Sequence, residues 1–192
     1  MIYFVRHGST DWNDFVNENG KIDPKCQGLK DLALNNHGLE QAYKLRETLK
    51  DVKFDRVLSS PLLRARQTCE IICNKNYKIE TDLRLIERDF GEFEGLTRKE
   101  FDFTDFWNIN SKTKYTKAET ISSVEKRVFN LLDELSKNPN QNVLIVSHGG
   151  VGLVFMSYFF GIPKNSNYIS FELGHGGYRC FDFNQKINQQ NI

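Results

Sequence analysis

The sequence predicts an α/β protein, a three-layer sandwich in which helices flank a mostly parallel central sheet. Two short runs, 2–5 and 143–146, are apolar at consecutive positions, as in strands that are buried on both faces. A longer segment, 120–137, carries apolar residues at helical spacing. Segments of these two kinds alternate along the chain, an order typical of a parallel sheet whose strands are connected by helices.

Size and charge limit the kinds of partner. A chain of 192 residues with 39% hydrophobic and 27% charged residues suits one globular domain over 1–192. Its 26 basic and 25 acidic residues lack the basic excess that nucleic acid or a membrane surface requires. No apolar run is long enough for a membrane span, and 1–5 is too short for a signal peptide. The four cysteines form no CxxC motif, so we expect a reduced, cytoplasmic protein.

The expected strands are short runs bounded by polar or glycine-rich residues. They lie at 2–5, 54–58, 78–81, 143–146, 169–173 and 178–183. The first is followed by Arg6 and His7, and the fourth by Ser147 and His148. A polar tail at 184–192 follows the last strand.

The expected helices lie at 39–50, 61–74, 97–107, 120–137 and 151–160. Ser60 is the expected N-cap of the second helix and Pro61 its first residue, since both types favour a helix start. The region 96–137 forms a helical insertion, whose aromatic stretch 101–107 either lines a pocket or packs a helix onto the sheet. The long polar loop 14–24 has no assignable role.

Basic and histidine side chains follow three of the expected strands. Open α/β sheets bind ligands at the carboxyl ends of their strands, where Arg6, His7, Arg64 and His148 would meet. Arginine forks and a helix N-terminus suit a phosphoryl group, and a neutral imidazole is a competent nucleophile. Each residue alone also fits an ordinary turn or surface position, so the hypothesis depends on their joint placement. The other two histidines are expected to be structural: His37 at a helix entry and His175 in a turn.

Four blocks of the sequence resemble, in order, the signatures of the histidine phosphatase superfamily, the phosphoglycerate-mutase-like family. They are Arg6-His7-Gly8-Ser9-Thr10 with Trp12-Asn13, then Ser59-Ser60-Pro61-Leu62-Leu63-Arg64-Ala65-Arg66-Gln67-Thr68, Leu85-Ile86-Glu87-Arg88-Asp89-Phe90-Gly91-Glu92-Phe93-Glu94-Gly95 and Val146-Ser147-His148-Gly149-Gly150. A phosphoglycerate-mutase-like sandwich is therefore the fold that the resemblance implies.

The resemblance also implies a role for each matching residue. His7 would be the nucleophile, and Arg6, Arg64 and His148 would hold the phosphate oxygens. Glu87 would give a proton to the leaving group and later accept one from water; only the resemblance selects it over Glu92 and Glu94. The further phosphate-binding or pocket-edge residues would be Asn13, Gln27, Gly28 and Gly149.

The implied function is a metal-independent phosphate monoester hydrolase with no cofactor, acting through a phosphohistidine on a small phosphorylated metabolite. A phosphoglycerate mutase is the alternative, although 101–117 lacks an arginine pair for a second anionic group. A catalytically silent phosphate-binding module is a third reading. Ser9, Lys25 and the stretch 118–120 depart from the family pattern and leave the substrate open. We expect no nucleic-acid or membrane partner, and either a monomer or a homodimer.

Overall fold

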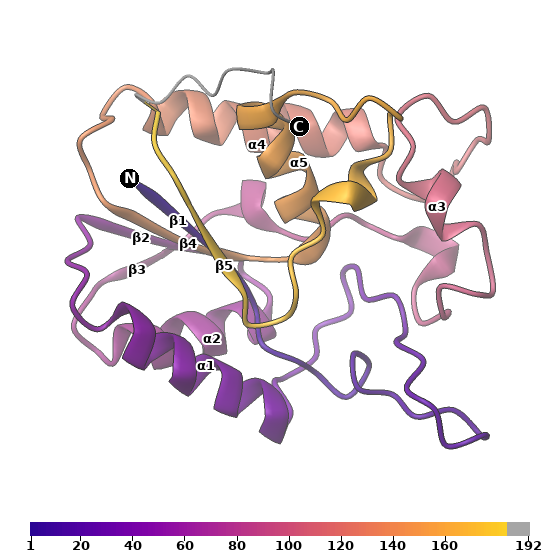
Figure 1. Cartoon of the computed structure of the whole chain (residues 1–192), viewed down its shortest axis with the longest axis horizontal. Helices are drawn as coiled ribbons and strands as arrows, with labels where there is room; N and C mark the ends of the chain where they lie inside the picture. The colour runs from indigo at the N-terminus through magenta and orange to yellow at the C-terminus, as the bar shows by residue number, and fades with distance from the viewer. Residues whose placement is uncertain (184–192) are drawn as a thin grey trace.

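A five-stranded sheet lies at the centre of the protein (Figure 1). The computed structural model describes residues 1–183. The strands are β1 (Ile2–Arg6), β2 (Arg56–Ser59), β3 (Ile79–Thr81), β4 (Val143–Ser147) and β5 (Tyr178–Phe181), in the order β3-β2-β4-β1-β5. β5 alone is antiparallel to its neighbour, β1. Arg6 pairs with Ser147, and Ser59 with Val146, so three carboxyl ends meet at one edge.

Helices cover both faces of the sheet (Figure 1). α1 (Asn36–Leu49) and α2 (Leu63–Cys73) lie on one face, and α4 (Ile121–Leu135) and α5 (Gly149–Phe160) on the other. The single turn α3 (Phe103–Phe106) lies beyond the sheet. Short 3₁₀ turns occupy Leu83–Leu85, Gly91–Phe93 and Tyr168–Phe171. Among residues 1–183, no helix is long and apolar enough to cross a membrane.

Consecutive apolar residues of each strand enter two different cores. Phe4 packs in the core on the side of α4 and α5, whereas Val5 packs in the core beside α1 and α2. Leu58 and Val57 of β2 divide in the same way. Because side chains alternate across a strand, burial on both faces requires the unbroken apolar runs seen in the sequence. The predicted three-layer arrangement is confirmed.

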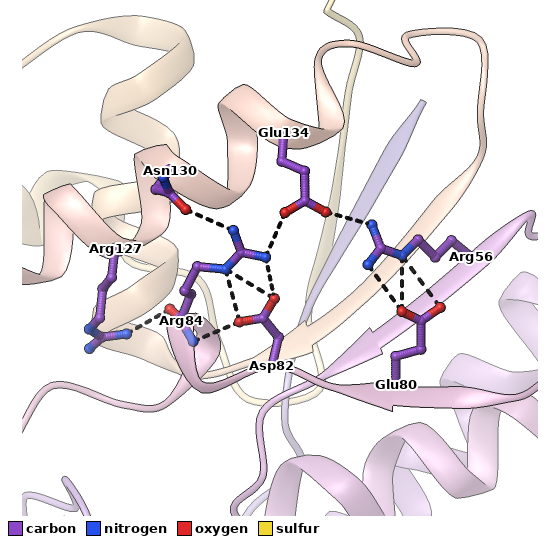
Figure 2. Close-up of polar contacts among 7 residues, drawn as sticks. All are labelled: Arg56, Glu80, Asp82, Arg84, Arg127, Asn130 and Glu134. Atoms are coloured by element: carbon purple, nitrogen blue, oxygen red, sulfur yellow. Dashed lines mark hydrogen bonds and ion pairs between the residues drawn. The ribbon is translucent and has the colours of Figure 1, made fainter.

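An ion-pair network joins α4 to the β2–β3 edge of the sheet (Figure 2). Glu134 on α4 accepts hydrogen bonds from Arg56 at 3.0 Å and from Arg84 at 2.9 Å. Arg56 also pairs with Glu80 on the neighbouring strand, and Arg84 with Asp82. The shared carboxylate of Glu134 therefore connects the helical layer to two adjacent segments of the sheet edge.

Two predicted elements are wrong. The helix expected at 97–107 is reduced to α3, because Thr97 is held in a β-bridge with Lys25 and the rings of Phe101 and Phe106 pack edge to face. The strand expected at 169–173 is the 3₁₀ turn Tyr168–Phe171, whose first turn is capped by the Asn167 side chain. In both places, side-chain packing and capping outweigh local propensity.

The predicted start of α2 is also wrong. Neither Ser60 nor Pro61 caps or begins the helix, which starts at Leu63. In the first turn, the backbone N–H of Leu63 donates to Asp31 Oδ1 at 2.6 Å, and Asp31 is distant in sequence. The other helices and strands match their expected positions to within a few residues. The polar tail at 184–192 lies outside the described residues.

Candidate active site

The carboxyl ends of β1, β2 and β4 meet at a cavity of about 330 Å³. The predicted site residues that line it are Arg6, His7, Asn13, Gln27, Glu87 and Gly149. Arg64 and His148 lie directly beside His7 and are fully buried. Arg6 and His7 at the end of β1, Arg64 in the first turn of α2 and His148 after β4 therefore lie together, as predicted.

His7 presents one ring nitrogen as a lone pair. Its Nδ1 lies 2.7 Å from the carbonyl oxygen of Gly8, which fixes the hydrogen on Nδ1. Nε2 then accepts from Arg64 Nε at 3.2 Å. Burial, followed by the charges of Arg64, His175 and Arg6, holds the pKa of His7 well below its ordinary value. The imidazole is neutral near pH 7, and its Nε2 is available as a nucleophile.

Arg64 connects His7 to the loop after β1. Its Nη1 donates to Lys30 O at 2.9 Å, and its Nη2 to Gly28 O at 2.8 Å. Gly28 thus contributes its carbonyl group to holding Arg64. Burial lowers the pKa of Arg64 to about 10, so the guanidinium keeps its charge near pH 7.

His148 is oriented by the segment that follows β2. Its Nε2 lies 2.7 Å from Ser60 Oγ, while that oxygen accepts from Leu62 N at 3.3 Å. Ser60 can therefore donate its own hydrogen to Nε2, which leaves His148 Nδ1 as an N–H donor. Nδ1 is buried and has no partner among residues 1–183. Burial lowers the pKa of His148 well below its ordinary value.

Glu87 is a buried carboxyl group beside the first turn of α5. It accepts backbone hydrogen bonds from Gly150 at 2.9 Å, Val151 at 3.2 Å and Arg88 at 2.8 Å. These bonds favour the charged form, but burial outweighs them and raises the pKa of Glu87. The carboxyl group can therefore hold a proton at higher pH than an ordinary glutamate.

The remaining predicted residues shape the cavity wall. Asn13 Oδ1 accepts from Thr10 N at 3.0 Å, and Gln27 Oε1 accepts from Thr10 Oγ1 at 2.9 Å. Gly149 leaves room for the Arg6 guanidinium, because a Cβ at this position would lie only 3.0 Å from Arg6 Cζ. Each of these residues therefore has a local structural partner at the edge of the site.

The sequence did not indicate His175 as a site residue. It lines the cavity, its Nε2 lies 2.6 Å from Arg6 Nη2, and its ring centroid is 5.6 Å from that of His7. The only available sequence signal was a histidine followed by a glycine. This signal does not separate active-site histidines from structural ones, because all four histidines of the chain precede a glycine.

Arg98 and Glu172, two charged residues at the outer rim of the cavity, were also not indicated by the sequence. Arg98 stacks over the Phe103 ring at 4.4 Å and pairs with Glu172 at 2.6 Å. Phe103 and Trp107 line the cavity, whereas Phe106 is buried in the core between Phe90 and Trp107. The stretch therefore lines a pocket through Phe103 and Trp107, whereas the expected helix packed onto the sheet is reduced to the single turn α3.

The described residues contain no group of three or more His, Cys, Asp or Glu side chains that could hold a metal ion. All four cysteines are free.

The sequence matches the histidine phosphatase superfamily (branch 1) over residues 2–189, and the chain belongs to this superfamily. The uncharacterized phosphatase PhoE of Bacillus subtilis is 36% identical over 151 residues, which cover 77% of this chain and 71% of PhoE. A protein of Erwinia tasmaniensis, named a probable phosphoglycerate mutase GpmB, is 31% identical over 86% of this chain and 77% of its own length.

A solved structure is similar over most of the chain. Phosphoserine phosphatase from Entamoeba histolytica, in complex with 3-phosphoglyceric acid, aligns with a TM-score of 0.75 and 28% identity, covering 92% of this chain and 87% of that one. The predicted superfamily, fold class and enzyme class, a phosphatase, are confirmed.

Proposed function

We propose that this phosphatase hydrolyses small phosphate monoesters through a phosphohistidine on His7, without a metal ion. The observation that carries the proposal is the neutral, buried His7, whose Nε2 accepts from Arg64 and whose ring centroid lies 5.1 Å from that of His148. The charge of Arg6 also acts on this imidazole. Arg6 Nε and His148 Nδ1 support the proposal, because both are buried donors without a partner among residues 1–183. A bound phosphate would supply the acceptors that these donors lack.

In the first step, His7 Nε2 attacks phosphorus and the bond from phosphorus to the ester oxygen breaks. Glu87 gives its proton to that oxygen, so the alcohol leaves neutral. In the second step, the Glu87 carboxylate takes a proton from water while the water oxygen attacks phosphorus. The N–P bond then breaks, inorganic phosphate leaves, and His7 and Glu87 regain their starting protonation states.

The cations supply the electrostatic part of catalysis. Phosphoryl transfer develops charge on the equatorial oxygens, so positioned donors in a buried site lower the barrier. Arg64 Nε–H donates to His7 Nε2. When His7 attacks the phosphorus of a bound substrate, a phosphate oxygen beside Nε2 would accept this hydrogen in place of His7. We infer that Arg6, Arg64 and His148 hold the phosphate, with Asn13 and Gly149 completing its surroundings.

The rim of the cavity favours hydrolysis over a mutase reaction. A mutase must grip a second anionic group, and the rim offers Arg98 and Lys25 as cations. Arg98 is already paired with Glu172, and Lys25 lies over the Phe15 ring at 4.1 Å. The small number of free cations supports a substrate with one phosphoryl group. Phosphoserine is a reasonable first compound to screen, since a structural relative is a phosphoserine phosphatase.

The deciding experiment is hydrolysis of p-nitrophenyl phosphate with EDTA present, comparing the wild type with His7→Ala. His37→Ala is the matched control, since its exposed imidazole pairs with Asp14 outside the site. We expect turnover by the wild type and the control, and a loss of at least about 10³-fold in His7→Ala. Activity that survives in His7→Ala would overturn the nucleophile, and inhibition by EDTA would overturn the metal-free mechanism.

Three broader expectations remain part of the proposal. The free cysteines support a reduced, cytoplasmic location. The two cores share one sheet, which supports a single domain over the whole chain. Nothing in the balanced charge favours a nucleic-acid or membrane partner.

A further inference from the structure

We propose that His175 is a positioning residue whose imidazole holds the Arg6 guanidinium in the orientation that binds phosphate. The inference rests on the proposed function, because it concerns how Arg6 is oriented for the phosphate binding proposed there. It extends the active site to the turn that precedes β5.

The contacts of Arg6 leave one edge of its guanidinium unoccupied. Nη1 donates to Leu173 O at 2.5 Å and lies 3.6 Å from Glu172 Oε1. Nη2 donates to His175 Nε2 at 2.6 Å. Nε has no partner among residues 1–183. A guanidinium carries five N–H donors in a fixed plane, so the segment 172–175 occupies the outer edge while Nε–H and the second Nη2 hydrogen stay available.

The backbone fixes the imidazole relative to Arg6. Gly176 N donates to His7 O at 3.1 Å, and Arg6 N donates to Gly177 O at 3.0 Å. Gly176 has a positive φ of 63°, which glycine adopts without strain, and it packs against Gln41. The turn that carries His175 is thereby bonded to the N–H at the start and the carbonyl group at the end of the Arg6–His7 dipeptide.

A neutral acceptor suits this position better than a carboxylate. Burial, followed by the charges of Arg6 and Arg98, lowers the pKa of His175 to about 2, so its Nε2 accepts a hydrogen bond at any working pH. Glu172 already places one carboxylate 3.6 Å from Arg6 Nη1, and a second one at position 175 would further reduce the positive charge that phosphate binding needs. His175 therefore orients Arg6 without adding a negative charge.

The test compares His175→Leu, which removes the acceptor, with His175→Gln, whose amide oxygen can replace it. We expect His175→Leu to lower kcat/KM for p-nitrophenyl phosphate about 10- to 100-fold, since a small misplacement of a positioned group has that effect. His175→Gln should recover most of the loss. Unchanged kinetics in His175→Leu, or equal losses in both variants, would overturn the inference.

A double-mutant cycle distinguishes positioning from general support of the fold. In an Arg6→Ala background, His175→Leu should change kcat/KM by no more than about twofold, because its effect passes through Arg6. A full loss in that background would contradict the inference. His37→Leu is the matched control, an exposed histidine that should behave as wild type in either background.

Binding of inorganic phosphate, measured by calorimetry, separates this inference from the proposed function. If the wild type binds phosphate but does not hydrolyse esters, the proposed function fails while the positioning role is still tested. We expect His175→Leu to raise Kd about as much as it lowers kcat/KM. Equal Kd values for wild type and His175→Leu, or a wild type that does not bind phosphate, would overturn the positioning role.

Discussion

At the scale of single residues, Glu87 experiences opposing influences on its proton. Burial raises its pKa, while three backbone N–H groups and the charges of Arg64 and Arg6 act in the other direction. The net shift is upward, so the protonated form persists to higher pH than in an exposed glutamate. That is the form that a general acid needs.

Glu87→Gln tests this role through the leaving group. We expect it to lower kcat/KM strongly for an alkyl phosphate, whose alkoxide needs a proton, and only weakly for p-nitrophenyl phosphate, because kcat/KM does not include the later step in which Glu87 acts as the base. In the wild type, activity on the alkyl ester should fall as pH rises through the raised pKa of Glu87; the variant should lack this fall. Initial rates across pH measure both effects.

Glu92→Gln is the matched control, because it makes the same change on an exposed neighbour that pairs with Lys117. It should leave both rates unchanged. Equal slowing of the two esters by Glu87→Gln would argue against a general acid at this position.

The central residues of the site were predictable and its third histidine was not. Arg6, His7 and His148 directly follow apolar runs, so sheet geometry alone brings them together. Glu87 required the family resemblance, because Glu92 and Glu94 lie within the same short block. His175 is brought to the site by antiparallel pairing of β5 with β1, a long-range contact with no local sequence signal.

At the scale of elements, the connection from β2 to α2 orients an active-site histidine, although its sequence suggests only a helix start. Ser60 resembles a helix cap, yet its hydroxyl contacts His148 Nε2. We expect Ser60→Ala to lower kcat/KM up to about tenfold, since a lost orienting hydrogen bond is worth about 0.5–1.5 kcal/mol. Steady-state kinetics with p-nitrophenyl phosphate measure this change.

Ser59→Ala provides the matched control for Ser60→Ala. Ser59 is equally buried, but its hydroxyl donates to the Ser60 carbonyl group at 2.9 Å instead of contacting His148. Both variants should lose a similar amount of stability in urea unfolding. A similar loss of activity in both would show that the serines support the fold and do not orient His148.

Elements with strong periodicity were predictable, and those decided by distant contacts were not. The apolar stripe of α4 and the unbroken run of β4 match the structure closely. Apart from the single turn α3, the 97–107 segment is non-helical, because its rings pack among one another and Thr97 pairs with Lys25. Such tertiary contacts have no counterpart in local sequence patterns.

At the scale of the whole molecule, charge is balanced overall and concentrated locally. The net charge is +1, and the arginines at the edge of the sheet are paired with carboxylates (Figure 2). Arg6 and Arg64 lie buried around the histidines, and Arg6 has a carboxylate neighbour in Glu172 at 3.6 Å. Affinity for phosphate is therefore expected from this one buried cluster and not from a general positive field.

The same cluster makes stability depend on pH. The pKa values of His7, His148 and His175 in the folded protein lie below the ordinary value of 6.5, so the unfolded chain binds more protons below that pH. Stability is therefore complete above about pH 6.5 and falls as pH decreases, by up to about 1.4 kcal/mol per pH unit for each histidine. The raised pKa of Glu87 has the opposite effect, since it makes the folded protein more stable as pH decreases, but it is one group and the histidines are three.

Urea unfolding at about pH 7.5 and about pH 5.5 measures this dependence as a change in the free energy of unfolding. His175→Gln removes one of the three groups, so its stability should fall less than that of the wild type between the two pH values. His37→Gln, at an exposed histidine, should keep the full dependence. Equal wild-type stability at both values would mean that the buried histidines take up protons without unfolding, and would contradict the lowered pKa values of His7, His148 and His175.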